Sequence, residues 1–302
     1  MIRFGIDLGG TKTEIIALDE RRGELARRRE PTPSGDYEAT LALVARLVRE
    51  TESDVGKRGS VGIGTPGSLS PATGLIRNSN STCLNGRALK ADLERVLGRE
   101  IRIANDANCF ALSEAVDGAA RSARVAFGVI LGTGVGGGIV VHGRVLGGAN
   151  GIAGEWGHNP LPSPEPNELP GPPCYCGRTG CIETFLSGGG LAGDHAHETG
   201  EKLAPPDIVT HAAGGHSAAE ATLARYENRL ARALASVINV LDPDVIVLGG
   251  GVSNIERLYS NVPRSWAGWI FSDVVRTRLV PNYLGDSSGV RGAALLWEEI
   301  RT

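Results

Sequence analysis

Residues 4–18 read FGIDLGGTKTEIIAL, and this stretch decides the fold. An apolar run leads into Gly9 and Gly10, and a second run of β-branched and apolar residues follows, which is the pattern of two strands joined by a tight turn. The dinucleotide fingerprint and the Walker A loop both need a helix after their glycines, and neither spacing is present. We therefore predict a β-hairpin. Its turn is either an ordinary tight turn or a phosphate loop, because glycines let backbone N–H groups approach an anion and Thr11 and Lys12 add donors.

The pattern occurs a second time in residues 127–141, FGVILGTGVGGGIVV. A shift of 123 positions matches Phe4 to Phe127, Gly5 to Gly128, Leu8 to Leu131, Gly9 to Gly132 and Ile16 to Ile139. Such a repeat predicts two related domains, each of which offers one phosphate loop to a cleft between them. Asp7 corresponds to Ile130, as expected if only one half holds a divalent cation through a carboxylate or its water shell. Thr133 and Gly134 would then contact phosphate from the opposite side.

A third glycine turn lies in residues 242–254, DPDVIVLGGGVSN. An apolar run predicts a buried strand that ends at Gly249, Gly250 and Gly251, with a helix after it. The absence of side chains would let a flat adenine or a ribose approach the backbone there. One such turn is weak evidence, but three on one chain favour a nucleotide site.

Composition limits the classes of partner. The chain has 302 residues, a formal net charge of −3 and 22% charged residues without a dense basic or acidic run. The length favours two domains, and the charge pattern argues against nucleic acid and membrane surfaces, which leaves a small molecule. No run approaches the roughly 18 apolar residues of a membrane span, and no basic segment precedes an apolar one at the start. We expect a cytoplasmic protein.

Three of the five cysteines lie in residues 174–183, CYCGRTGCIE. In a reducing cytosol such a cluster is more often a metal site than a disulfide. Cys174, Cys176 and Cys181 supply three thiolates, and tetrahedral zinc needs one more ligand, for which His158 is the nearest upstream histidine. The C-x-C spacing departs from the commoner C-x2-C pair, so a loop of unligated cysteines stays as the alternative.

Seven motifs in order resemble those of the ROK family, the bacterial sugar kinases and sugar-sensing repressors of the actin-like (ribonuclease H-like) ATPase fold. They are GIDLGGTKTE, ANDANCFALSEA, LGTGVGGGI, GEWGHNP, CYCGRTGCIETFLSG, DVIVLGGG and GDSSGVRGAALLW, and the resemblance runs from residue 2 to about 298. It implies an α/β protein with two actin-like domains, a cleft between them and a zinc-pinned loop. We expect a small domain of residues 1–119 plus 287–302, and a large domain of residues 120–286 that carries the zinc loop.

Elements of both domains are expected from periodicity. The expected strands lie near 2–8, 13–18, 60–64, 101–104, 125–132 and 137–142, and the expected helices near 37–52, 88–97, 107–117, 217–241 and 287–300.

Asn105 and Asp106 stand immediately before a segment with helical apolar spacing, where either residue is a good N-cap. The resemblance implies more: Asp106 as the catalytic base that faces a sugar hydroxyl, and Asn105 as a contact to a neighbouring hydroxyl. Glu155 and Glu183 are either surface charges or sugar contacts, and the resemblance favours contacts, because each glutamate lies beside an expected zinc ligand. It also implies that His158 uses one ring nitrogen for zinc and the other for a hydroxyl.

The expected site residues fall into three groups. ATP and Mg²⁺ are expected at Gly5, Asp7, Gly9, Gly10, Thr11, Lys12, Gly132, Thr133, Gly134, Gly136, Gly137, Gly249, Gly250 and Gly251. The sugar is expected at Gly67, Asn80, Asn105, Asp106, Glu155, His158 and Glu183, and structural zinc at His158, Cys174, Cys176 and Cys181.

The expected function is ATP-dependent phosphorylation of a free hexose at its 6-hydroxyl. D-fructose is the expected hexose, because NSNSTCLNG, the Pro-rich loop before Cys174 and DSSGVRG resemble the fructokinase and mannokinase branch. The alternatives are a kinase for glucose, mannose or an N-acetylhexosamine, and a sugar-responsive repressor. The repressor is disfavoured because the first strand follows Met1 directly and no basic patch is present. We also expect a homodimer.

Overall fold

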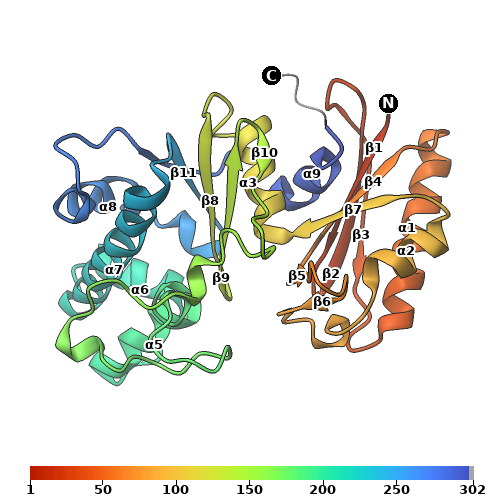
Figure 1. The fold of residues 1–302 in the computed structure, drawn as a ribbon. Coiled ribbons are helices and arrows are strands. Elements are labelled where there is room, and N and C mark those ends of the chain that lie inside the picture. The colour runs from red at the N-terminus through yellow and green to blue at the C-terminus, as the bar shows by residue number, and fades with distance from the viewer. Residues whose placement is uncertain (299–302) are drawn as a thin grey trace. The chain divides into compact units, whose positions relative to one another are not determined.

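The computed structural model describes residues 1–298, apart from the side chain of Asp286 (Figure 1). Its first five-stranded sheet has the order β3-β2-β1-β4-β7. The strands are β1 (Arg3–Leu8), β2 (Lys12–Leu18), β3 (Glu24–Pro31), β4 (Ser60–Thr65) and β7 (Ile101–Asn105). β1 pairs antiparallel with β2 and parallel with β4, and β4 pairs parallel with β7. A short hairpin, β5 (Ser68–Leu69) with β6 (Ile76–Arg77), follows β4.

The second sheet has the order β10-β9-β8-β11-β12. Its strands are β8 (Val125–Leu131), β9 (Val135–Val141), β10 (Arg144–Val145), β11 (Val245–Gly249) and β12 (Arg278–Pro281). β11 pairs parallel with both β8 and β12, as β4 does with β1 and β7. The bounds of β2 and β9 differ by the same 123 positions that relate the two glycine turns. The repeat seen in the sequence is therefore a repeat of strand order as well.

The helices pack partly on these sheets and partly on one another (Figure 1). They are α1 (Tyr37–Val55), α2 (Leu89–Leu97), α3 (Asp106–Val116), α4 (Ile182–Leu186), α5 (Gly188–Thr199), α6 (Pro205–Ala213), α7 (Ser217–Leu241), α8 (Leu258–Trp266) and α9 (Ser288–Leu295). Within the described residues none of them is both long enough and apolar enough to cross a bilayer. The helix expected over 287–300 is shorter, and positions 299 and 300 lie outside the described residues.

Side chains along β1 alternate between the two faces of the first sheet. Phe4, Ile6 and Leu8 point into the core formed with α1 and α2. Gly5 and Asp7 point to the opposite face, which α9 covers. A Cβ on Gly5 would lie 2.1 Å from the backbone oxygen of Val290, so only glycine lets α9 approach this strand.

The chain divides into two compact units. The first comprises Met1–Arg121, Gly138–Ala153 and the chain from Leu284 onward, and the second comprises Ser122–Gly137 and Gly154–Tyr283. The expected domains, 1–119 with 287–302 and 120–286, divide the chain along similar lines but place residues 138–153 with the second part. Their assignment as domains stays a prediction.

Candidate active site and metal centre

The first glycine turn joins β1 to β2, as predicted. The backbone N–H of Gly9 donates to the carbonyl of Lys12 at 3.0 Å and closes the turn. A Cβ on Gly9 would lie 2.8 Å from that carbonyl oxygen, which explains the glycine. Gly10, Thr11 and Lys12 are exposed, so their groups are accessible to an anion. The hairpin is confirmed, and phosphate binding by it stays a prediction.

Asp7 lies at the end of β1 in an acidic environment. Burial, followed by the charges of Asp106 and Glu14, raises the pKa of Asp7 to about 6. Glu14 is its direct partner across the β1–β2 pair. Lys12 and Arg29 partly oppose this rise, and two arginines already pair with Glu14. A divalent cation near Asp7 and Asp106 would stabilise their ionised oxygen atoms. The expected Mg²⁺ contact of Asp7 fits this environment.

Asn105 and Asp106 begin α3. The side-chain oxygen of Asn105 accepts the N–H of Ala107 at 2.9 Å, so Asn105 is the N-cap. Oδ1 of Asp106 also accepts this N–H, at 2.8 Å. The Asn105 amide donates to the carbonyl oxygen of Gly67 at 3.1 Å. Two amino acids of the expected sugar-binding site are therefore in contact.

Gly67 also fixes the loop that carries Asn80. Its φ is +80°, and a Cβ there would lie 2.4 Å from the Arg77 carbonyl oxygen and 2.8 Å from the Ser79 nitrogen. The side-chain amide of Asn85 makes two hydrogen bonds to the backbone of Ser79. Its oxygen accepts the Ser79 N–H and its nitrogen donates to the Ser79 carbonyl oxygen, each at 2.9 Å. Asn80 is exposed on this braced loop. Gly67, Asn80, Asn105 and Asp106 thus form one group on the first unit.

The second glycine turn joins β8 to β9. The N–H of Gly132 donates to the Gly134 carbonyl at 2.9 Å, and the N–H of Val135 donates to Oε2 of Glu183 at 2.9 Å. Gly137 has a packing role, because a Cβ there would lie 2.5 Å from the carbonyl oxygen of Gly154. The neighbouring Gly136 accepts the indole N–H of Trp156 at 3.4 Å.

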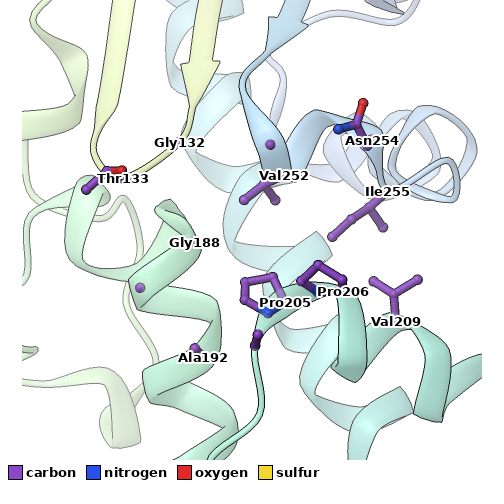
Figure 2. Close-up of a pocket in the computed structure, with 13 residues that line it drawn as sticks. Gly132, Thr133, Gly188, Ala192, Pro205, Pro206, Val209, Val252, Asn254 and Ile255 are labelled. Atoms are coloured by element: carbon purple, nitrogen blue, oxygen red, sulfur yellow. The ribbon is translucent and has the colours of Figure 1, made fainter. Parts of the chain in front are cut away.

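A pocket with a volume of about 900 Å³ opens beside this turn (Figure 2). Gly132 and Thr133 line one end, together with Gly188 and Gly189 at the start of α5. Figure 2 shows Pro205, Pro206 and Val209 on one side, and Val252 and Ile255 opposite them. An apolar wall that ends at a polar backbone turn suits a nucleoside with its phosphates.

The sequence predicted only part of this pocket. Of the third glycine turn, Gly251 lines it. Gly250 instead packs on β8, since a Cβ there would lie 2.5 Å from the carbonyl oxygen of Leu131, and Gly249 pairs with Ile130 in the sheet. The apolar wall was missed, although the Pro205–Pro206 pair is a recognisable helix start.

The four expected zinc ligands come together. The ligand atoms of His158, Cys174, Cys176 and Cys181 all lie within 4.8 Å of one another. The sulfurs of Cys176 and Cys181 are 3.6 Å apart, and Nδ1 of His158 is 3.6 Å from the sulfur of Cys174. Tetrahedral zinc, with bonds of about 2.3 Å to sulfur and about 2.0 Å to nitrogen, would separate such pairs by about 3.8 and 3.5 Å. Both the donor set and its spacing therefore fit zinc.

Further contacts support this cluster. Nε2 of His158, the nitrogen expected to bind a sugar hydroxyl, lies 2.9 Å from the hydroxyl of Tyr175. Burial and the neighbouring thiols raise the pKa of Cys181 to about 12, an effect that a cation at the centre would oppose by stabilising the thiolate. Tyr175 was not predicted, and its position between two of the clustered cysteines was the available signal.

Buried ion pairs fasten the Pro-rich loop that precedes the cysteines. Oε1 of Glu168 accepts from Arg229 at 2.8 Å and from Arg232 at 2.7 Å, and both arginines lie on α7. The Arg232 guanidinium also donates to the carbonyl oxygen of Ser163 at 2.6 Å. α7 therefore holds the chain between His158 and Cys174 in place.

The two glutamates beside the zinc ligands differ in position. Glu155 is half-buried directly before the 3₁₀ turn Trp156–His158. Glu183 lies in the first turn of α4, directly against the second glycine turn.

Comparison with known proteins gives consistent results. The model of the ROK family matches residues 3–300. The N-acetyl-D-glucosamine kinase of Pectobacterium atrosepticum is 41% identical over 297 residues, which cover 97% of this chain and 98% of that protein. A ROK hexokinase structure from Thermus thermophilus has a TM-score of 0.87 at 32% identity, with 98% of this chain and 97% of that chain covered. A ROK family glucokinase from Streptomyces griseus, in complex with glucose and AMPPNP, has a TM-score of 0.77 at 26% identity, with 98% and 99% covered.

Proposed function

Because the chain belongs to the ROK family, we propose that it is a hexose kinase that transfers the terminal phosphoryl group of ATP to the 6-hydroxyl of N-acetyl-D-glucosamine. The observation that carries this proposal is the 41% identity to an N-acetyl-D-glucosamine kinase over nearly the full length of both chains. The nucleotide pocket and the acidic groups at Asp7 and Asp106 are the features that such a reaction needs.

The choice of sugar differs from the sequence expectation. Short motifs favoured D-fructose, and an N-acetylated hexosamine was an alternative. Two relatives that match nearly the whole chain, from Pectobacterium atrosepticum and from Yersinia pseudotuberculosis, are N-acetyl-D-glucosamine kinases at 41% identity. The comparisons therefore support the alternative better, and fructose is not confirmed.

The nucleotide is assigned to the pocket of the second unit. The base and ribose would lie against the apolar wall of Pro205, Val252 and Ile255, with the phosphates toward Thr133. The related glucokinase structure contains AMPPNP, an ATP analogue, which supports ATP as the donor. Thr11, Lys12 and the glycine N–H groups would stabilise charge on the phosphoryl group as it transfers.

Asp106 is the proposed base. A bond forms between the sugar oxygen and the terminal phosphorus as the bond from that phosphorus to the bridging oxygen of ADP breaks, and the hydroxyl proton passes to Asp106. In a loose transition state the carboxylate mainly orients the hydroxyl and takes the proton late. Asp7 would hold Mg²⁺ directly or through water, and the bound ion would neutralise negative charge on the phosphates.

Zinc is the proposed occupant of the His158, Cys174, Cys176 and Cys181 cluster. Four protein ligands leave no open position on a tetrahedral ion, so its role is structural. A cytoplasmic location and a homodimer are proposed as well, on the sequence expectations alone.

The specificity is tested by ADP release across a hexose panel with the zinc-loaded protein. We expect kcat/KM for N-acetyl-D-glucosamine to exceed that for glucose, mannose and fructose by at least about tenfold, the scale on which one pocket contact discriminates. A preference for fructose would restore the sequence expectation. Turnover of ATP at the same rate with and without sugar would contradict a sugar kinase.

A further inference from the structure

We propose that Glu183 is a positioning residue that couples the metal loop, Cys174–Cys181, to the nucleotide loop, Gly132–Val135, so that losing either the metal or this carboxylate weakens nucleotide binding. The inference rests on the proposed binding of ATP phosphates at the nucleotide loop. It assigns Glu183 a task separate from the expected sugar contact.

The carboxylate of Glu183 lies against the nucleotide loop. Oε2 accepts the N–H of Val135 at 2.9 Å, and a Cβ on Gly134 would lie only 2.7 Å from the same oxygen. A hydrogen bond to a charged acceptor is about twice as strong as a neutral one. Glycine at 134 thus allows close contact, and the charged bond holds the end of the loop that leads into β9.

The other end of the loop is held by the same segment of chain. The N–H of Gly188 donates to the carbonyl of Gly132 at 2.8 Å, and the N–H of Ser187 donates to the carbonyl of Glu183 at 3.0 Å. Residues 183–188 therefore clamp both ends of the nucleotide loop. The pocket residues Gly132 and Gly188 are two of the groups that this clamp brings together.

The clamp begins at the metal centre. Cys181 is the residue directly before α4, and its carbonyl accepts the N–H of Thr184 at 2.9 Å. The N–H of Ile182 donates to the carbonyl of Asn159, the neighbour of the ligand His158, at 2.9 Å. Cys181 and the neighbour of His158 thus hold the first turn of α4, and Glu183 lies in that turn. An ion bound by Cys181 and His158 would restrain both segments further, so we expect its removal to loosen the alignment of Glu183 with Val135.

The test measures the dissociation constant of ATP by calorimetry without sugar, so that a sugar contact of Glu183 has no effect. Wild type, Glu183→Ala and Glu183→Gln are compared in zinc-loaded form. We expect Glu183→Ala to weaken ATP binding about tenfold, in line with the loss of a charge-assisted bond. Glu183→Gln keeps an amide oxygen that can accept the Val135 N–H and should stay within about threefold of wild type. The control is Glu201→Ala, an exposed residue just after α5.

Coupling is tested by adding metal removal to these comparisons. Stripping zinc should weaken ATP binding by wild type and add little to the defect of Glu183→Ala, because both changes act through one contact. If the zinc-free protein unfolds, zinc retention against a chelator is measured instead, with and without saturating ATP. Saturating ATP should tighten zinc retention in wild type but not in Glu183→Ala.

The possible results distinguish the failure of this inference from the failure of the proposed function. ATP binding by zinc-loaded Glu183→Ala within twofold of wild type would overturn the inference while leaving the kinase proposal intact. Equal effects of zinc loss, or of ATP on zinc retention, in wild type and Glu183→Ala would overturn the coupling. Zinc-loaded wild type that binds no ATP would refute the proposed function and this inference together.

Discussion

Asp106 lies at the first position of α3, directly after the residue that caps this helix. Its carboxylate oxygen accepts the N–H of Ala107, while Asn105 provides the N-cap. The helix start was predictable because Asn and Asp are strong capping residues. The proposed catalytic role rests on the resemblance alone, because a carboxylate at a helix start has the same local signature whether or not it meets a substrate.

Replacing Asp106 by Asn should leave the fold intact and lower kcat by at least about 100-fold, the lower range for loss of a general base. The amide oxygen can still accept the Ala107 N–H, so the melting temperature should change little. The matched control is Asp36→Asn at the N-cap of α1, where Asp36 accepts the N–H of Ala39. Activity of Asp106→Asn within a few-fold of wild type would refute the base assignment.

Asp7 leads to a prediction about pH. Its folded pKa of about 6, raised first by burial, lies above the ordinary value of 3.8. Between these values the folded protein binds more protons than the unfolded one, so stability falls as pH rises through this window. Without Mg²⁺, wild type should therefore lose more free energy of unfolding than Asp7→Asn, by up to about 3 kcal/mol between pH ~4 and pH ~7.

Urea denaturation at several pH values measures this difference. Parallel pH profiles for the two proteins would show that Asp7 does not titrate abnormally. Added Mg²⁺ should reduce the difference, since a cation favours the ionised carboxylate.

At the scale of elements, the predictions held where apolar periodicity was strong. β1, β2, α3 and α7 lie close to their expected bounds. β3 (Glu24–Pro31) was missed because it is an edge strand rich in charge, whose Arg27 and Arg29 pair with the buried Glu14 of β2. α5 was missed because it starts with three glycines, which are poor helix formers. Tertiary contacts override local preference in both.

The metal loop leads to a prediction about zinc content. We expect one tightly held zinc per chain, lost in Cys176→Ser, because three remaining ligands do not complete a tetrahedral site. Elemental analysis after dialysis measures the zinc. Cys83→Ser is the control, since Cys83 is not in the cluster. Wild type without zinc, or Cys176→Ser with a full equivalent, would contradict the metal assignment.

At the scale of the whole molecule, a duplicated strand order carries different residues at equivalent positions. The two sheets repeat one topology, yet Asp7 stands in the first copy where Ile130 stands in the second. The presence of two related units was predictable because the glycine turns recur at one spacing, and the actin-like fold was predictable from the resemblance. The preferred hexose was not predictable, because the substituents of a sugar are recognised by loop contacts that short motifs do not encode. Identity over nearly the full length supports an N-acetylhexosamine better than the short motifs support fructose.

The central claim is a phosphoryl transfer from ATP to a sugar. The most direct measurement is identification of the products, by phosphorus NMR and mass spectrometry, after zinc-loaded protein is incubated with Mg²⁺, ATP and N-acetyl-D-glucosamine. We expect one N-acetyl-D-glucosamine 6-phosphate for each ADP formed. Consumption of ATP to ADP and free phosphate without any phosphorylated sugar, for every hexose supplied, would contradict it.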